Sequence, residues 1–582
     1  MKNYKKVYAA FILAGGLILH GCNGIFDDLA INPNQPSMGA YFTSPSAVND
    51  AVMTMYGYMS TQRCLGASGS KTTIIRSDEA SSNSDYGKPG MFGADLNASY
   101  YTIEQPYTLM YTTASQASYI IETAPSVDFS GNEELRNAYM GEAYFWRAFA
   151  HYYLLINFRN ISPIRQMPRN GDDYVRPLEK PAAVWDFIQE DLAHAKELLP
   201  VKGYWDSKNA GRVTKASAAA LLGKAYLYRS GIEQYYGEDK TTFYSEAAKE
   251  FGDVIDGKYG TYDLTKNYAD NFDVAHENNE ESILEFQFLG DVDNAGFNPG
   301  LATSGLAFDS RGLMLPGAGV GYEGVVHNWL YNAFVNSVDK DGYTDIRMFS
   351  TMIFNDLDAS IHLRNDAGGN PVRLEGPGGY KWEELYPAKN GKEGFATVSN
   401  PLAHSFKAGI RKGIDCSMPT QTEADGTPKL VGVGAGVKEY VYNQPRAHGV
   451  NWRYIRYADV LMMYAESVVS GGTPASNMTP LQAVNKVRGR VNMSELPSVT
   501  MTDIQNERIL EFALEGHRFY DLLRWGKLAS RFTELQESDP NFKKFISADD
   551  FKGFVTNKHE WLPIPINEVN SNPYITENNP GY

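Results

Sequence analysis

A dense group of ionisable side chains lies near the carboxyl end of this 582-residue sequence. Four of these side chains could transfer protons, namely Glu507, Glu511, Glu515 and His517. On a helix, however, Arg508 would lie beside Glu511 and Arg518 beside Asp521, at a spacing of three residues. Alternating charges among large apolar residues are typical of a partly buried ion network that fixes how helices dock. We therefore predict a structural network here and no catalytic site.

Other catalytic motifs are missing from the sequence. His559 precedes Glu560, but no histidine follows four residues later, so the helical zinc-binding pair of metalloproteases is not formed. There is no G-x-S-x-G nucleophile motif and no phosphate-binding loop. The glycines between Gly317 and Gly324 lack the strand–loop–helix setting of a nucleotide site and indicate turns. The sequence predicts a protein that is not an enzyme and uses no cofactor. It offers no candidate metal ligands, and whether a structural metal ion is bound stays open.

The first 21 residues have the character of a secretory signal. Three lysines precede an apolar run at residues 7–19, which is too short for a stable membrane span. The run ends in Leu19-His20-Gly21-Cys22, which resembles the bacterial lipobox, where cleavage makes the cysteine the first residue and acyl chains are attached to it. We expect Cys22 to be lipidated and residues 22–45 to form a polar tether. Asp27 and Asp28 resemble the acidic signal that exports lipoproteins to the cell surface.

Charge and cysteine content narrow the class of protein further. The formal net charge of −16 becomes −19 when residues 1–21 are removed, because they contain three lysines and no acid. An acidic chain without a basic stripe binds the phosphate backbone poorly, which argues against a nucleic-acid partner. Besides Cys22, only Cys64 and Cys416 are present, and they could form a disulfide or remain two buried thiols. Neither cysteine has the spacing of a zinc site.

Helical periodicity dominates two parts of the chain. It begins near Ser46 and recurs in the ranges 136–157, 183–199, 214–229, 244–255, 454–469, 480–490 and 501–525. Small residues on one face of the range 214–229 are typical of the second helix of a tetratricopeptide-like pair. We predict a mostly α fold of irregular helix pairs in a single domain, 46–582. Its helical scaffold covers about 46–257 and 452–582, and a variable insertion of loops and short strands covers about 258–451.

Several ordered motifs carry a resemblance to a known family. They are Arg453-Tyr454-Ile455-Arg456-Tyr457-Ala458-Asp459, Glu511 to Trp525, Leu562-Pro563-Ile564-Pro565 and Asn579-Pro580-Gly581-Tyr582, with earlier landmarks at Arg76 to Glu79, Gly141 to Ala148 and Gly211 to Lys215. In this order they resemble the SusD/RagB family of nutrient-binding outer-membrane lipoproteins. The resemblance spans essentially the whole chain after the signal.

The resemblance implies a fold and a function. The fold is four irregular tetratricopeptide-like helix pairs that cap a TonB-dependent, SusC-like β-barrel transporter in the outer membrane. The function is the capture of oligosaccharides at the cell surface and their delivery to that transporter. RagB-like members carry oligopeptides instead, so a peptide ligand is the main alternative. An outer-membrane glycosidase and a purely structural scaffold remain as rivals.

In this family the helices are scaffold and variable loops hold the ligand, which directs attention to loop aromatics. The chain contains 38 Tyr, 28 Phe and 8 Trp, and exposed aromatic faces flanked by polar groups suit the flat face of a sugar. The candidate ligand-binding residues are Arg76, Asp78, Tyr86, Phe92, Tyr100, Tyr101, Tyr322 and Trp382. If their segment is extended, Tyr100 and Tyr101 point in opposite directions, so at most one is a platform.

Aromatic residues on helical stripes are assigned to the core instead. Trp146, Trp185 and Trp525 lie on such stripes. Trp329 lies in a short amphipathic segment and is also predicted to be core.

Overall fold

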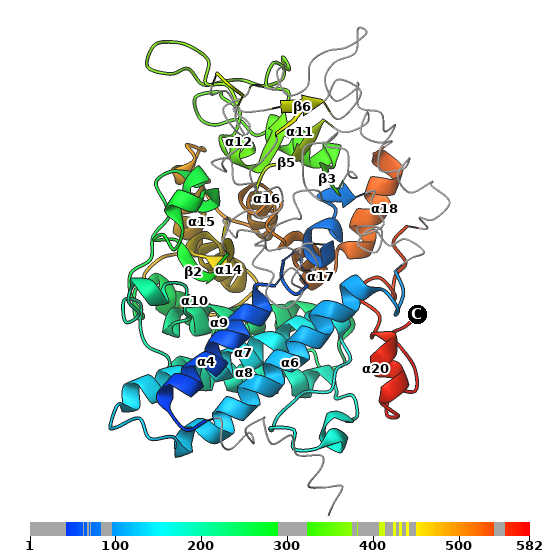
Figure 1. Cartoon of the computed structure of the whole chain (residues 1–582). Helices are drawn as coiled ribbons and strands as arrows, with labels where there is room; N and C mark the ends of the chain where they lie inside the picture. The colour runs from blue at the N-terminus through cyan, green and yellow to red at the C-terminus, as the bar shows by residue number, and fades with distance from the viewer. Residues whose placement is uncertain are drawn as a thin grey trace, which may run out of the picture.

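A computed structural model gives the fold of the chain (Figure 1). The residues that it describes are 42–61, 63–66, 69, 71–82, 96–288, 323–374, 381, 407–413, 423–425, 430–432, 438–440, 450–539 and 553–582. The signal, Cys22, almost all of the expected tether and Cys416 lie outside these residues. Cys64 lies inside them and is a free, buried thiol whose pKa is raised by burial.

The amino-terminal half forms a layer of packed helices. They are α4 (Pro45–Met59), α6 (Tyr101–Thr123), α7 (Glu133–Phe158), α8 (Pro181–Leu198), α9 (Lys215–Tyr236) and α10 (Tyr244–Ile255). Neighbours in sequence pack on one another, as helix pairs require. The side chain of Asn132 caps α7, and Thr214 and Ser217 form a capping box on α9. Trp146 and Trp185 are buried between the helices, as predicted.

The carboxyl-terminal part continues this layer. Its helices are α14 (Tyr457–Val469), α15 (Pro480–Arg490), α16 (Met501–Glu511), α17 (Arg518–Arg524), α18 (Leu528–Ser538) and α20 (Ile566–Ser571). Helix α14 packs on α10 and on α15, and α17 packs on α9, so the two halves share one core. Trp525 is buried in it, as predicted. The predicted mostly α fold is confirmed.

Two predicted helices have different boundaries in the structure. The range 501–525 is two helices, because the backbone turns at residues 512–517, where Leu514 and Gly516 have φ of 61° and 85°. The range 454–469 begins with strand β8 (Trp452–Arg456), which pairs antiparallel with β2 (Ser282–Phe286). Every residue of β8 is buried, so the strand shows no alternation of polar and apolar residues that could distinguish it from a helix.

The expected insertion contains short strands and helices, as predicted. A four-stranded antiparallel sheet has the order β1 (Ala80–Ser82), β3 (Glu323–Val326), β5 (Ala408–Ile410) and β4 (Met352–Phe354). The insertion also contains helices α11 (Asn328–Val335) and α12 (Arg347–Thr351). A separate two-stranded sheet pairs β6 (Leu430–Gly432) with β7 (Lys438–Tyr440). The outer strand β1 comes from the amino-terminal part of the chain, so the sheet joins the insertion to the scaffold.

Short helical turns connect these elements. They are the π-helix η1 (Lys71–Ile75) and the 3₁₀ turns η3 (Ala124–Ser126), η4 (Gly171–Tyr174), η5 (Ser207–Asn209), η6 (Tyr268–Phe272) and η7 (Val274–His276). None of the helices in the described part of the chain has both the length and the apolar character needed to span a bilayer.

Candidate functional site

Tyr100 and Tyr101 form an aromatic pair at the start of α6, and only Tyr101 is exposed. Their ring centroids are 5.3 Å apart and the rings are tilted by 38°. Tyr101 is 40% exposed, whereas Tyr100 is half-buried and packs on the core. The two rings would point in opposite directions only in an extended segment, and the segment here is the start of a helix. Tyr100 is the residue that caps α6, and its carbonyl accepts hydrogen bonds from the N–H groups of Ile103 and Glu104, so the chain is already turning here.

Polar groups from two distant segments border this pair. The carboxyl of Glu104, on the first turn of α6, accepts a hydrogen bond from the exposed side-chain amide of Asn567 on α20. The backbone N–H of Ile566 donates to the carbonyl of Ala98 at 2.8 Å, which fixes α20 beside the start of α6. We name Tyr100, Tyr101, Glu104 and Asn567 the Tyr100–Tyr101 surface. Sequence reasoning missed Asn567 because 463 residues separate it from its partner.

The chemistry of this surface is that of binding. An exposed aromatic ring offers a flat apolar face, and a carboxylate and an amide beside it accept and donate hydrogen bonds to hydroxyl groups. Among the described residues, no group of three or more His, Cys, Asp or Glu side chains is arranged to hold a metal ion.

Arg76 was predicted to contact ligand, but the structure places it inside the protein. Its guanidinium donates to the carbonyls of His559 and Glu560 at 3.1 and 2.9 Å and to the side chain of Asn157 at 3.3 Å. It also lies over the ring of Phe519, 4.0 Å from the centroid. Burial lowers the pKa of Arg76. These contacts tie the amino-terminal segment to the carboxyl-terminal end of the chain, so Arg76 has a structural role.

Asp78 is likewise buried and has a structural role. Both of its oxygens accept from Arg518, at 2.9 and 3.0 Å, and one also accepts from Arg531 at 2.7 Å. Burial alone would raise the pKa of Asp78, but the two guanidinium groups lower it below its usual range. The backbone carbonyl of Asp78 accepts from the indole N–H of Trp329, which is only partly buried against the core. The Asp78 side chain is 0% exposed, so a ligand cannot reach it in this conformation.

The remaining candidates lie outside the described residues. They are Tyr86, Phe92, Tyr322 and Trp382. Their assignment to the ligand site stays a prediction.

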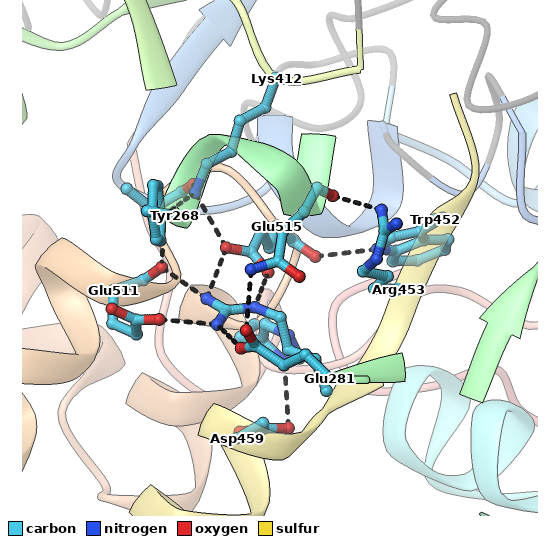
Figure 2. A network of polar contacts seen from close by, with 12 residues as sticks. Tyr268, Glu281, Lys412, Trp452, Arg453, Asp459, Glu511 and Glu515 are labelled. Atoms are coloured by element: carbon cyan, nitrogen blue, oxygen red, sulfur yellow. Dashed lines mark hydrogen bonds and ion pairs between the residues drawn. The ribbon is translucent and has the colours of Figure 1, made fainter. Parts of the chain in front are cut away.

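The predicted ion network is present and is deeply buried (Figure 2). At its centre the guanidinium of Arg456, on β8, contacts three carboxylates at 2.6–3.0 Å: those of Glu281, Glu511 and Glu515. Lys412, which follows β5 of the insertion, donates to Glu515 at 2.9 Å and to the carbonyl of Ala513 at 2.8 Å. Burial opposes the charge of Arg456, but the carboxylates raise its pKa well above the usual value.

The charges of this network balance. It contains five cations, Arg347, Lys412, Arg456, Arg488 and Arg490, and five carboxylates, Glu281, Asp345, Glu507, Glu511 and Glu515. Arg347 and Asp345 come from the insertion, so the network joins the insertion to α15 and α16. A buried charge is costly unless it is paired, and here every charge has a partner.

A second buried group surrounds α17, and its pairing differs from the prediction. Arg508 pairs with Asp459 and Asp521, both at 2.8 Å, and not with Glu511. Arg518 pairs with Asp78, and not with Asp521. The helical spacing of both predicted pairs is kept within α16 and α17, but other cations bind the expected partners. Glu511 is bound by Arg347, Arg456 and Arg490, and Asp521 by Arg508 and Arg524.

The acid/base interpretation of this segment has no support in the geometry. Burial, followed by the nearby charge of Lys224, lowers the pKa of His517 to about 4, so the imidazole is neutral at neutral pH. Burial would raise the pKa of Glu511, but three arginines lower it far below its usual range. The side chains of Glu507 and Glu511 are at most 1% exposed and bound to arginines, so no substrate can reach them.

Comparisons with known proteins identify the family. The SusD family model matches residues 422–582, and a second SusD-like model, described as starch-binding and associating with the outer membrane, matches residues 31–227. A SusD-like protein of Bacteroides ovatus is 24% identical over 533 residues, covering 90% of this chain and 83% of the relative. SusD-like protein P2 of Formosa agariphila is 25% identical over 608 residues, covering all of both chains.

Solved structures have the same fold. A SusD superfamily protein from Bacteroides vulgatus gives a TM-score of 0.66 at 22% identity, covering 93% of this chain and all of the other. A laminarin-binding SusD-like protein gives 0.64 at 22% identity, with the same coverage. Surface glycan-binding protein A from Bacteroides thetaiotaomicron, in complex with laminarihexaose, gives 0.63 at 17% identity, covering 92% and 100%. The fold and the two family models therefore define the class: the chain is a SusD-like protein, which confirms the predicted family.

Proposed function

We propose that this protein is a lipid-anchored glycan-binding protein of the outer membrane. It captures oligosaccharides at the cell surface and delivers them to a partner TonB-dependent, SusC-like transporter. The protein binds and releases its ligand and breaks no bond in it, so it is not an enzyme.

The observation that carries this proposal is the match of both ends of the chain to SusD-family models. One of these models is described as starch-binding and associating with the outer membrane. Two proteins of the same fold are laminarin-binding or bound to laminarihexaose, which supports a carbohydrate ligand. The lipobox around Cys22 supports lipid anchoring, and the acids behind it support exposure at the surface.

We assign part of the ligand contact to the Tyr100–Tyr101 surface. Tyr101 presents an exposed ring, and Glu104 and Asn567 provide polar groups beside it. Tyr86, Phe92, Tyr322 and Trp382 complete the proposed set of contacts.

Isothermal titration of the lipid-free chain tests the ligand class. The ligands are starch and laminarin oligosaccharides, a wider polysaccharide panel and a mixture of oligopeptides. We expect saturable binding of one glycan class, and chromatography of the recovered ligand should show that it is intact. Binding of peptides alone would establish the RagB-like alternative. Hydrolysis of a bound polymer would show that the protein is an enzyme.

The transporter partnership needs a separate test. We expect a SusC-like barrel to co-purify with this protein from outer membranes extracted in mild detergent. Recovery of the protein without any barrel, in membranes that contain both, would contradict the proposed delivery role.

A further inference from the structure

Glu79 is a buried carboxyl at the junction of three separate segments. It lies between η1 and β1, and its side chain is almost completely inaccessible to solvent. Its backbone carbonyl accepts from the N–H of His327 in the insertion at 2.9 Å. Its side-chain Oε1 accepts from the N–H of Leu514 at 3.0 Å, in the turn between α16 and α17. One residue thus links the amino-terminal segment, the insertion and the carboxyl-terminal helices.

Counting hydrogens around Ser77 indicates the protonation state of Glu79. The hydroxyl of Ser77 has one hydrogen, and the carbonyl of Ile74, which can only accept, lies 2.7 Å from it. Ser77 Oγ therefore acts as an acceptor toward its other neighbours, and it accepts the N–H of Glu79 at 3.1 Å. Its 3.3 Å contact with Glu79 Oε2 avoids sharing that single hydrogen between two acceptors when the carboxyl supplies the proton.

The surrounding charges agree with a neutral carboxyl. Three charged groups face it: Asp78 from its own segment, Arg518 from α17 and Lys412 from the insertion. Arg518 is committed to Asp78 and Lys412 to Glu515, and within the described residues no cation forms an ion pair with Glu79. Burial is the largest influence and raises the pKa of Glu79 to about 8, with Asp78 adding to it and the Leu514 N–H, Arg518 and Lys412 opposing it.

We propose that Glu79 is a proton-sensitive lock, which holds the three segments together as a neutral acid and loosens their junction when it ionises. The turn at residues 512–517 depends on this contact, because Glu79 satisfies the N–H of Leu514, a residue with positive φ. An ionised carboxylate loses its hydrogen bond to Ser77 and introduces an unpaired charge beside the carboxylate of Asp78.

The sign of the pH dependence follows from the two states. In the opened junction Glu79 meets water and has a pKa of about 4.5, whereas in the closed junction its pKa is about 8. The closed form therefore binds one extra proton between these two values. Raising the pH through this window should favour opening by up to tenfold per pH unit, and the effect should level off above pH 8.

Hydrogen exchange of the full chain, read by mass spectrometry, tests the proposal. At each pH from 5 to 9, the exchange rate of a peptide spanning residues 510–518 in the wild type is divided by the rate of the same peptide in Glu79→Gln. Intrinsic chemistry cancels in this ratio, and glutamine mimics the neutral acid. We expect the ratio to rise up to tenfold per pH unit until about pH 8. Glu495→Gln, which alters an exposed acid, should give a constant ratio near one.

A second measurement needs no variant at Glu79. In the wild type alone, exchange in the 510–518 peptide is divided by exchange in the turn at residues 470–473, which contains no acid. This ratio should follow the same curve. A ratio that is flat between pH 5 and 8 in either experiment would overturn the proposal.

Discussion

At the scale of single residues, Tyr101 is the exposed aromatic residue of the proposed ligand surface. Its ring stands at the surface beside Tyr100, while the backbone below it is fixed by the first turn of α6. We expect Tyr101→Ala to remove about 1–2 kcal/mol of binding free energy, the scale of aromatic stacking, which is roughly a five- to thirtyfold weaker complex. Isothermal titration with the oligosaccharide that the wild type binds gives this value.

The control for this change is another exposed tyrosine. Tyr174→Ala removes a ring that is 56% exposed on η4 and is not part of the Tyr100–Tyr101 surface, so it should leave the affinity unchanged. Neither change should alter the free energy of unfolding by more than about 0.5 kcal/mol. Equal affinities of Tyr101→Ala and the wild type would remove the Tyr100–Tyr101 surface from the ligand site.

Arg456 pairs with three carboxylates of the buried network. Arg456→Met leaves Glu281, Glu511 and Glu515 with fewer cations in an interior that water does not reach. We expect the free energy of unfolding to fall by about 3–5 kcal/mol, because uncompensated buried charge is expensive. Urea unfolding followed by circular dichroism measures this loss.

An exposed ion pair provides the comparison. Arg165→Met breaks a pair with Glu179 in which both side chains are at least one-third exposed, and it should cost less than about 1 kcal/mol. If the two substitutions cost the same, the network would have no special structural importance. Ligand affinity of the folded Arg456→Met protein should match that of the wild type, since Arg456 is remote from solvent.

At the scale of elements, a glycine substitution in the turn between α16 and α17 can be compared with one in the middle of a helix. Gly516 has φ of 85°, and an added Cβ would lie 3.0 Å from Thr73 Oγ1. Gly516→Ala should therefore lower the free energy of unfolding by about 1–2 kcal/mol. Gly489, in α15, has open space around it, so Gly489→Ala should leave stability unchanged or raise it by up to about 1 kcal/mol. Thermal unfolding of both variants, with opposite signs expected, checks the assignment.

The elements also show what sequence patterns can predict. Helices such as α10 and α15 were predicted with their boundaries, because each buries one face. Helix α6 was missed as a helix because its first turn contains Tyr100 and Tyr101 after a polar segment, and because Pro106 interrupts the pattern. The range 501–525 is divided into two helices by a backbone turn, which the hydrophobic periodicity of the sequence does not reveal.

The candidate site was predictable only in part. Tyr101 could be chosen as a candidate because it is an aromatic residue among polar neighbours. Asn567 could not, because the docking of α20 brings it to Glu104. The charges of Arg76 and Asp78 suggested exposure, since most charged residues lie at the surface. Their burial depends on partners more than 400 residues away, which no local pattern contains.

At the scale of the whole molecule, the ends of α6 lie near the expected tether and the proposed ligand surface. Phe42, at the end of the expected tether, packs on Tyr119 near one end of the helix, 4.8 Å between ring centroids. Tyr101 lies at the other end, roughly 27 Å away at 1.5 Å per residue. The chain therefore enters the body far from the Tyr100–Tyr101 surface (Figure 1).

The anchor itself is tested by Cys22→Ala. We expect this variant to be folded but absent from the membrane fraction, because the acyl chains that hold the protein cannot be attached. Immunoblotting of soluble and membrane fractions measures the distribution. Membrane retention equal to that of the wild type would show that Cys22 is not the anchor.

The balance of the buried network has a consequence for how the protein responds to salt. Since its five cations and five carboxylates cancel, the net charge of −16 must come from groups outside it. Mobile ions screen exposed charges over roughly 10 Å at 0.1 M, but they do not enter a dry interior. Added salt should therefore weaken the repulsion among surface acids and leave the internal attractions intact. The buried network should therefore keep its contribution to the free energy of unfolding as the ionic strength of the surroundings rises.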